Sequence, residues 1–226
     1  MPSHSHRGKF ITFEGLDGCG KSTQLERLAA ALRADGFAVV VTREPGGTET
    51  GEKVRRLLLD TATAGLSPYA ELALMFASRA QHIKEVIQPA MTEGKIVLCD
   101  RFTDSTEAYQ GGGRELGSEP VLALHRIVSG DIRPDLTILM DSDVSHSVER
   151  ARRRNLGRGA QGDYDENRFE QESRAFFGRV RNAYLAIAAR EPERVVLINA
   201  RGTPDETHGR IVEIVRRKLK LAAKTA

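Results

Sequence analysis

The stretch from residue 15 to residue 22 has the residue types and the spacing of a phosphate-binding loop. It fits G-x-x-x-x-G-K-[ST] in the run Gly15, Leu16, Asp17, Gly18, Cys19, Gly20, Lys21 and Ser22. Glycines let successive backbone N–H groups point at phosphate oxygens, and a helix that follows adds partial positive charge. Lys21 would supply a point charge for the β- and γ-phosphates, and the Ser22 hydroxyl would ligate Mg²⁺. We therefore expect this loop, with Thr23, to bind a nucleoside triphosphate.

Asp100 and Arg101 follow a third apolar run and bear on what happens to the phosphate. Switch GTPases, motors and small-molecule kinases all share the loop, so the loop alone does not decide. A carboxylate at the end of a strand is placed to hold the magnesium shell, which makes Asp100 a candidate metal ligand. The guanidinium beside it matches a phosphate bidentately, although a structural salt bridge would use the same residue type.

Two further groups have the helical spacing of a nucleoside-binding surface. One comprises Ser105, Thr106, Tyr109 and Gln110, whose hydroxyls, amide and phenol would share a helix face. That face could read a base and a sugar, and a helix that is polar toward solvent would look the same. The other comprises Met75, Phe76 and Arg79, where an apolar platform beside a guanidinium could stack a base. A core contact with a surface arginine is the alternative.

A basic stretch leads into a glycine-rich segment at residues 155–167. Its arginines are Arg150, Arg152, Arg153, Arg154 and Arg158. Guanidiniums followed by glycines suit a lid, over 152–167, that brings positive charge to a transferring phosphoryl group and excludes water. A solvated helix end is the alternative.

The elements that must position these residues alternate along the chain. Short apolar runs predict strands at 10–13, 37–41, 96–99, 136–140 and 195–198, the second buried on both faces. Periodicity predicts helices at 21–34, 48–59, 68–90, 103–109, 118–129, 144–154, 168–190 and 204–221, with a loop at 111–113. The pattern indicates one α/β domain over 1–226, with a doubly wound, five-stranded parallel sheet covered by helices on both faces. Ligands would then sit beyond the carboxyl ends of the strands.

The amino-acid composition limits which binding partners and which cellular compartment are expected. A net charge of +3 is too small for a chain-wide nucleic-acid surface, and the chain has no Trp for extended base stacking. No apolar stretch approaches the roughly 18 residues that span a bilayer. The two cysteines, Cys19 and Cys99, are expected to be reduced thiols. We therefore expect a cytoplasmic protein without membrane or nucleic-acid partners, whose polar residues 1–8 are disordered and carry no secretory signal.

Several stretches, spread over most of the chain, resemble bacterial thymidylate kinases, also called dTMP kinases. They are FITFEGLDGCGKST at 10–23, TREPGGT at 42–48, LMFASRAQH at 74–82, DRFTDSTEAYQGGGR at 100–114 and RPDLTILMD at 133–141. The resemblance implies a P-loop kinase fold and transfer of the ATP γ-phosphoryl group to dTMP, giving dTDP and ADP, with Mg²⁺. It also implies a homodimer.

The same resemblance implies roles for individual residues. Lys21 and the loop amides would hold ATP, and Arg101 with Arg55 would grip the acceptor's phosphate. Asp17 would lie near the sugar and phosphate of dTMP. The base and sugar would be contacted by Arg79 at a thymine carbonyl, Thr106 and Gln110 at the base, Tyr109 at the deoxyribose, and Ser105 beside them. The chain looks like the type whose catalytic arginine comes from the lid, because no Arg lies between Gly15 and Lys21; Arg154 is the choice, with Arg153 and Arg158 as rivals.

The chain departs from the family pattern in two places. The base-stacking Phe of the family sits four residues before the arginine, where this chain has Met75, and Phe76 comes one residue later. After the lid, the family's Asp-Arg-Phe-Glu reads Asn167-Arg168-Phe169-Glu170. Other functions also stay open from the residues: a kinase for dUMP, dCMP or a deoxynucleoside, a nucleotide-dependent switch, and nucleic-acid binding through the basic lid.

Overall fold

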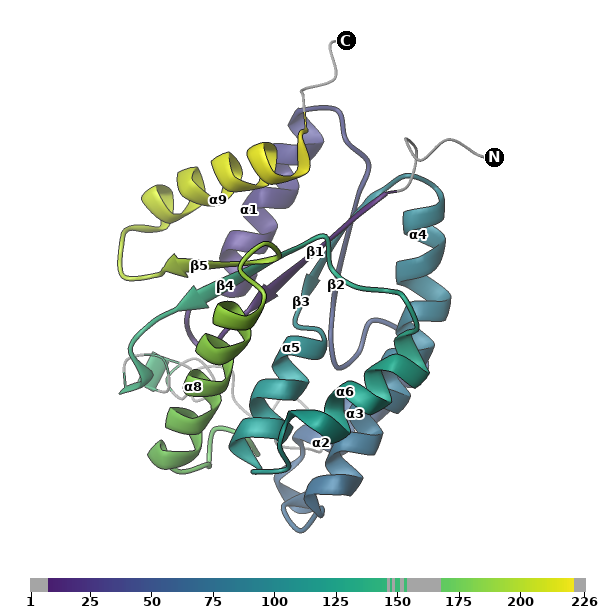
Figure 1. The fold of residues 1–226 in the computed structure, drawn as a ribbon, viewed down its shortest axis with the longest axis vertical. Coiled ribbons are helices and arrows are strands. Elements are labelled where there is room, and N and C mark those ends of the chain that lie inside the picture. The colour runs from purple at the N-terminus through teal and green to yellow at the C-terminus, as the bar shows by residue number, and fades with distance from the viewer. Residues whose placement is uncertain (1–7, 146, 148, 151–152, 154–167, 222–226) are drawn as a thin grey trace.

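The computed structural model describes residues 8–145, 147, 149–150, 153 and 168–221 (Figure 1). Five strands form a sheet in the order β2-β3-β1-β4-β5, and every neighbouring pair is parallel. The strands are β1 (Lys9–Glu14), β2 (Val39–Arg43), β3 (Ile96–Asp100), β4 (Leu136–Asp141) and β5 (Val195–Asn199). The predicted five-stranded parallel α/β fold is therefore confirmed.

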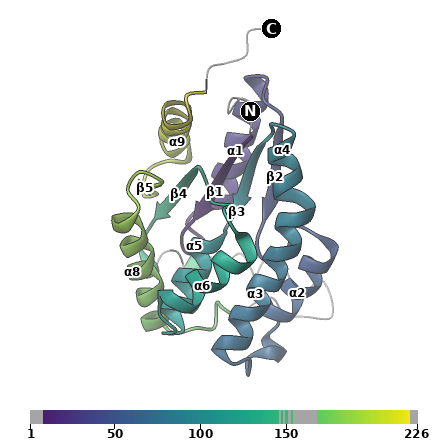
Figure 2. The ribbon, with the colours of Figure 1, turned by 45° about the vertical axis from the view of Figure 1, so that its right-hand side comes forward.

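Helices cover both faces of this sheet (Figures 1 and 2). α1 (Lys21–Ala34) and α9 (Pro204–Leu219) pack together on one face, where Ile11 and Phe13 of β1 join their core. Phe10 points the other way and packs with Ile87 and Met91, as the alternation of side chains along a strand requires. The sheet is also flanked by α2 (Glu49–Leu59), α3 (Pro68–His82), α4 (Gln88–Thr92), α5 (Thr103–Thr106), α6 (Ser118–Ser129) and α8 (Arg174–Arg190). A 3₁₀ turn lies at Thr61–Thr63, and a π-helical turn at Ile83–Ile87 joins α3 to α4.

The glycines at 111–113 are helical, which corrects the predicted loop. α5 continues directly into a π-helical segment, Glu107–Gly113, that packs along α8. A Cβ on Gly112 would lie 2.6 Å from the Cβ of Ala183, and one on Gly113 would lie 2.5 Å from the Phe176 ring. The glycines therefore allow two helices to approach closely, and this tertiary contact outweighs the low helix propensity of glycine.

Three other predictions differ from the structure in detail. β2 lies at an edge of the sheet and is half-buried, so the expectation of burial on both faces was wrong. α8 begins at Arg174, because Ser173 caps it by accepting a hydrogen bond from the Phe176 amide, and residues 168–170 form a turn. Gly8 is buried and its amide donates to Met91 O at 2.8 Å, so it is not part of a disordered lead. Residues 1–7 lie outside the described part.

The carboxyl ends of the strands meet at one edge. The register pairs Phe13 with Asp100, Arg43 with Asp100, and Glu14 with Leu139. The loops that leave β1, β2, β3 and β4 therefore emerge side by side, which is where a ligand site is expected in this architecture. Of the helices that the structure describes, none has the length and apolar character needed to cross a bilayer.

Candidate active site

The phosphate loop lies between β1 and α1, as predicted. Gly15, Gly18 and Gly20 have φ values of 130°, 80° and 97°, a region that side chains with a Cβ rarely adopt. Lys21 begins α1, is 5% exposed, and donates from Nζ to Gly15 O at 3.1 Å and Leu16 O at 2.9 Å. The backbone carbonyls of the phosphate loop thus hold the Lys21 ammonium group in place.

Ser22 and Asp100 meet at the mouth of this loop. Ser22 Oγ donates to Asp100 Oδ2 at 2.9 Å, and Asp100 Oδ1 is buried without a hydrogen-bond partner in the described part of the chain. A hydroxyl and an unpartnered carboxylate oxygen are hard ligands that suit Mg²⁺, which keeps several waters and takes few protein ligands. In the same described residues, no group of three or more His, Cys, Asp or Glu side chains could hold a metal ion. The residues present therefore fit a magnesium ion shared with a nucleotide.

Arg101 lies directly across from the loop. Its Nη2 donates to Asp17 Oδ1 at 2.9 Å and to the Tyr109 hydroxyl at 3.2 Å, while Nη1 donates to Ser105 Oγ at 2.8 Å and to the Tyr184 hydroxyl at 3.1 Å. Burial by itself lowers the pKa of Arg101, but Asp17 and the two phenols raise it well above its usual range. The guanidinium is therefore a fixed cation with a set orientation.

Arg79 is clamped deeper in the same region. Its Nε donates to Glu44 Oε2 at 2.7 Å and its Nη2 to Thr106 Oγ1 at 2.8 Å, while Nη1 is buried without a partner among the described residues. The guanidinium lies between two rings, 4.7 Å from the centroid of Phe76 and 4.9 Å from that of Phe102. Burial alone would raise the pKa of Glu44, but Arg79 and His82 hold it below its usual value. The pair is thus a buried ion pair that fixes the arginine.

Met75 and Phe76, the two apolar candidates for stacking against a base, lie in different surroundings. Phe76 is buried with Leu72 and Val121 in a core cluster, under the guanidinium, and is not among the residues that line the cavity described next. Met75 does line it. Of the two residues between which the sequence left the choice open, Met75 faces the cavity, and Phe76 supports the Arg79 guanidinium from the core side.

One cavity of about 700 Å³ collects these residues. The loop contributes Asp17, Gly18 and the segment 20–23, and the strand ends contribute Glu44, Asp100 and Arg101. The rest of the lining includes Arg55, Met75, Arg79, Phe102, Ser105, Thr106, Tyr109, Gln110, Arg150 and Phe169. Arg55 donates to Pro45 O at 3.1 Å, and Gln110 Nε2 donates to Glu71 Oε1 at 2.7 Å. Lys21 and Arg101 thus open onto the same space.

Some residues of this region were not predicted. Glu14 and Glu44 stand at the ends of β1 and β2, a position that could have marked them as functional. Tyr184 contacts Arg101 from 83 residues away, and Glu71 reaches Gln110 from the middle of α3; nothing in their local sequence signals this. A second cavity of about 650 Å³ is lined by Asp143, Arg150, Arg153, Arg201 and Gly202 with their neighbours, beyond the ends of β4 and β5. Arg153 is exposed, and the predicted lid residues Arg152, Arg154 and Arg158 lie outside the described residues.

The fold and this cavity define a phosphate-loop nucleotide kinase, in which the phosphate loop with Lys21 and the guanidinium of Arg101 line the same cavity. The family model "Thymidylate kinase" matches residues 13–211. A thymidylate kinase of Pseudomonas syringae pv. tomato is 53% identical over 85% of this chain and 88% of its own length, and one of Desulfosudis oleivorans is 48% identical over 92% and 96%. The solved thymidylate kinase of Ehrlichia chaffeensis superposes with a TM-score of 0.73 and 33% identity over 93% of this chain and 99% of that one. The chain belongs to the thymidylate kinase family, whose members phosphorylate dTMP to dTDP with ATP as the phosphoryl donor.

Proposed function

We propose that this chain transfers the γ-phosphoryl group of ATP directly to the phosphate of dTMP inside the cavity that Lys21 and Arg101 share. A phosphate oxygen of dTMP attacks the γ-phosphorus, the bond from that phosphorus to the bridging oxygen breaks, and ADP leaves. The shared cavity carries the proposal, because two anion-binding groups on one space let a phosphoryl group cross without an enzyme-bound intermediate.

On the donor side, the loop amides and Lys21 bind the triphosphate. Ser22 and Asp100 would hold Mg²⁺, which, when bound, neutralises charge on the phosphates. The second cavity, lined by Arg150 and Arg201 beyond the ends of β4 and β5, shares Arg150 with the first cavity and suits the remainder of the donor nucleotide. The chain's own residues thus bind and orient the donor.

On the acceptor side, Arg101 and Arg55 grip the phosphate of dTMP, and Asp17 lies near its sugar. The base occupies the deeper end, where Arg79 presents a donor to a thymine carbonyl and Met75 offers an apolar platform. The remaining contacts come from Ser105, Thr106, Tyr109 and Gln110, all of which line the cavity. Positioning and charge neutralisation then account for catalysis.

The role of Arg101 can be tested with Arg101→Lys. Lysine keeps the charge but loses the planar fork that Asp17, Ser105 and two phenols now hold, so kcat/KM for dTMP should fall about 10- to 100-fold. Steady-state kinetics with dTMP and ATP varied separately provide the measurement. Arg190→Lys is the matched control, since Arg190 pairs with Glu107 outside the cavity. Equal kinetics for both variants would remove Arg101 from the acceptor site.

The lid arginine is a separate proposal. By resemblance to the family, Arg154 stabilises the charge of the transferring phosphoryl group, so Arg154→Ala should lower kcat about 10³-fold with little change in the Kd for ATP. Rapid-quench and nucleotide-binding measurements separate the two effects. An unchanged kcat would reject Arg154 and turn attention to Arg153 or Arg158.

Assembly and location complete the proposal. Large apolar side chains are exposed on two helices that pack together: Ile127 on α6 is 79% exposed and Tyr69 on α3 is 62% exposed. Such exposure fits burial in a homodimer, whose mass by sedimentation equilibrium would be twice 24.9 kDa. The modest net charge and the two buried free thiols fit a cytoplasmic enzyme without a nucleic-acid partner.

A further inference from the structure

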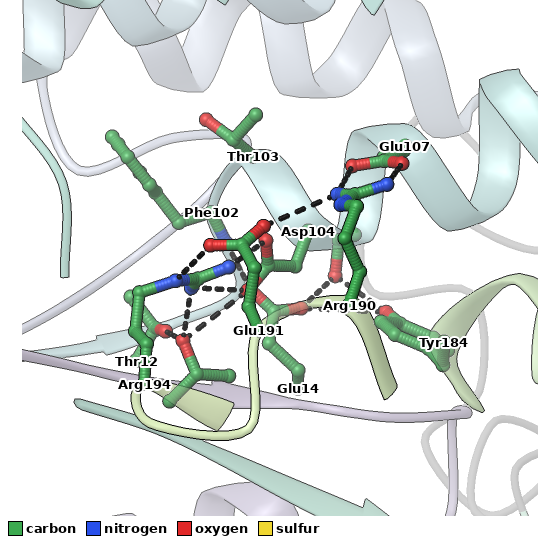
Figure 3. Close-up of polar contacts among 12 residues, drawn as sticks. Thr12, Glu14, Phe102, Thr103, Asp104, Glu107, Tyr184, Arg190, Glu191 and Arg194 are labelled. Atoms are coloured by element: carbon green, nitrogen blue, oxygen red, sulfur yellow. Dashed lines mark hydrogen bonds and ion pairs between the residues drawn. The ribbon is translucent and has the colours of Figure 1, made fainter. Parts of the chain in front are cut away.

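Glu14 is a fully buried carboxylate at the junction of the donor and acceptor sites. It is the last residue of β1, directly before the phosphate loop, and is 0% exposed. Figure 3 shows it among polar side chains from β1, α5 and α8. Within the described part of the chain, no lysine or arginine lies at ion-pair distance from it. Its partners are instead the Phe102 amide and the hydroxyls of Ser105 and Tyr184.

The first contact of Glu14 holds the backbone around Arg101. Arg101 has φ +71°, a conformation that is unfavourable for a residue with a side chain. Its own amide donates to Phe13 O at 2.9 Å, and the next amide, of Phe102, donates to Glu14 Oε1 at 2.8 Å. Two consecutive residues of β1 therefore fix the two peptide groups on either side of the Arg101 α-carbon and keep this strained turn in place.

The other contacts of Glu14 reach the Arg101 side chain through two hydroxyls. Ser105 donates to Glu14 Oε2, and the single proton of the Tyr184 hydroxyl can go to Glu14 Oε2 at 3.3 Å or to Ser105 Oγ at 2.7 Å. Both hydroxyl oxygens accept from Arg101 Nη1. Because an ionised carboxylate only accepts, the Ser105 proton points to it, and Ser105 then offers only lone pairs to Tyr184 and to Arg101. The Tyr184 proton therefore points to Ser105 or Glu14, and its lone pairs face the guanidinium. Glu14 thus determines that these hydroxyls act as acceptors for Arg101.

We propose that Glu14 is a positioning residue for the acceptor-phosphate site, which holds Arg101 by its backbone and, through Ser105 and Tyr184, by its side chain. The proposal rests on the proposed role of Arg101 as the group that grips the phosphate of dTMP. It assigns to Glu14, which directly precedes the phosphate loop, the task of holding the arginine across the cavity. Glu14 itself does not touch the substrate.

The proposal requires Glu14 to be ionised. A carboxylate can accept from the amide and from both hydroxyls, whereas a neutral carboxyl or an amide presents a donor on one side and opposes one of them. Burial and the nearby Asp104 raise the pKa of Glu14 to about 7, while Ser105 and Arg101 act in the opposite direction. Asp104 is itself held by Arg194 at 2.7 and 2.9 Å. Protonation of Glu14 below neutrality should therefore loosen Arg101.

Glu107 provides a control within the same buried cluster. It is 3% exposed and pairs with Arg190 at 2.6 and 2.8 Å, and Figure 3 shows this pair apart from Glu14. Glu107→Gln makes the same chemical change as Glu14→Gln and keeps one acceptor oxygen for Arg190. It contacts neither Arg101 nor the hydroxyls that hold it.

The experiment compares steady-state kinetics of wild type, Glu14→Gln and Glu107→Gln from pH 6 to pH 8. We expect Glu14→Gln to raise the KM for dTMP about tenfold at pH 8 and to change the KM for ATP less than twofold. The ratio of this KM to that of wild type should shrink toward pH 6, where wild-type Glu14 is also protonated; the titration of the dTMP phosphate cancels in the ratio. Glu107→Gln should match wild type throughout.

An unchanged KM for dTMP in folded Glu14→Gln, or a ratio that does not vary with pH, would overturn the proposal. Thermal unfolding establishes whether the variant is folded. If Glu14→Gln is not folded, Tyr184→Phe is the second variant, because it removes one of the two hydroxyls between Glu14 and Arg101 and leaves the carboxylate. This variant should raise the KM for dTMP several-fold and leave the KM for ATP unchanged. An unchanged KM for dTMP would equally overturn the proposal. Arg101→Lys distinguishes failure of the Glu14 proposal from failure of the proposed function, because normal kinetics of Arg101→Lys would contradict the proposed function itself.

Discussion

Two neighbouring carboxylates beside the acceptor site have different partners. Asp104 is bound by both Nη atoms of Arg194, whereas Glu14 is bound by an amide and two hydroxyls. Burial without a direct cation disfavours the charged form, and this is the main reason that the pKa of Glu14 rises to about 7. The ionised form of Glu14, which holds Arg101 in the acceptor site, therefore lowers the stability of the folded state at the pH where the enzyme needs it.

This cost can be measured as a pH dependence of stability. The folded-state pKa of Glu14 is above its unfolded value near 4.5, so the folded state binds the extra proton between these values. The free energy of unfolding of wild type, relative to Glu14→Gln, should therefore be highest below about pH 4.5 and fall as the pH rises through about 7, by about 3 kcal/mol in all. Urea unfolding at pH 5, 6, 7 and 8 measures it. Parallel stability curves for the two proteins would show that Glu14 does not titrate in this range.

At the scale of residues, prediction from sequence depended on local motifs. Arg101 and Arg79 belong to motifs with recognisable spacing, and both line the cavity. Their partners Tyr184 and Glu44 come from distant parts of the chain, so spacing could not reveal them. The choice between Met75 and Phe76 depends on how α3 is rotated against α2 and α6, and the identity of two adjacent residues does not reveal that rotation.

At the scale of elements, the π-helical segment Glu107–Gly113 decides where the acceptor site lies. It continues α5, so that Ser105, Tyr109 and Gln110 remain on one helical stretch against the cavity. Three consecutive glycines predict a loop from local propensity, and only the partner helix α8 reveals why the segment is helical. By contrast, the capped helices agree with their sequence signals: Thr203 and Glu206 form a capping box at the start of α9.

The packing of this segment gives a prediction about stability. Gly112→Ala would place a methyl group 2.6 Å from the Cβ of Ala183, so it should lower the free energy of unfolding by about 1–3 kcal/mol. Gly178→Ala is the control within α8, because nothing lies within 4 Å of its added Cβ; it should raise stability by about 0.5–1 kcal/mol. Thermal or urea unfolding compares the two. A stabilised Gly112→Ala protein would show that the two helices are not in close contact.

At the scale of the whole molecule, the alternation of apolar runs and helical periods was sufficient to predict the parallel sheet. That architecture brings the ends of β1, β2 and β3 together, and with them the phosphate loop, Glu44 and Arg101. The order of the strands and the edge position of β2 were not predictable, since they depend on which strands pair. A single cavity that holds both the phosphate loop and Arg101 follows from this topology.

The central claim, that this cavity joins a triphosphate to a nucleoside monophosphate, is tested most directly by product formation across an acceptor panel. ATP, Mg²⁺ and each of dTMP, dUMP, dCMP and thymidine are supplied, and ADP and the phosphorylated acceptor are quantified by chromatography. The account predicts that dTMP is converted to dTDP with the highest kcat/KM, and that thymidine, which offers Arg101 no phosphate, is lower by about 10³-fold or more. ADP formation that is independent of any acceptor, or thymidine phosphorylated as well as dTMP, would contradict it.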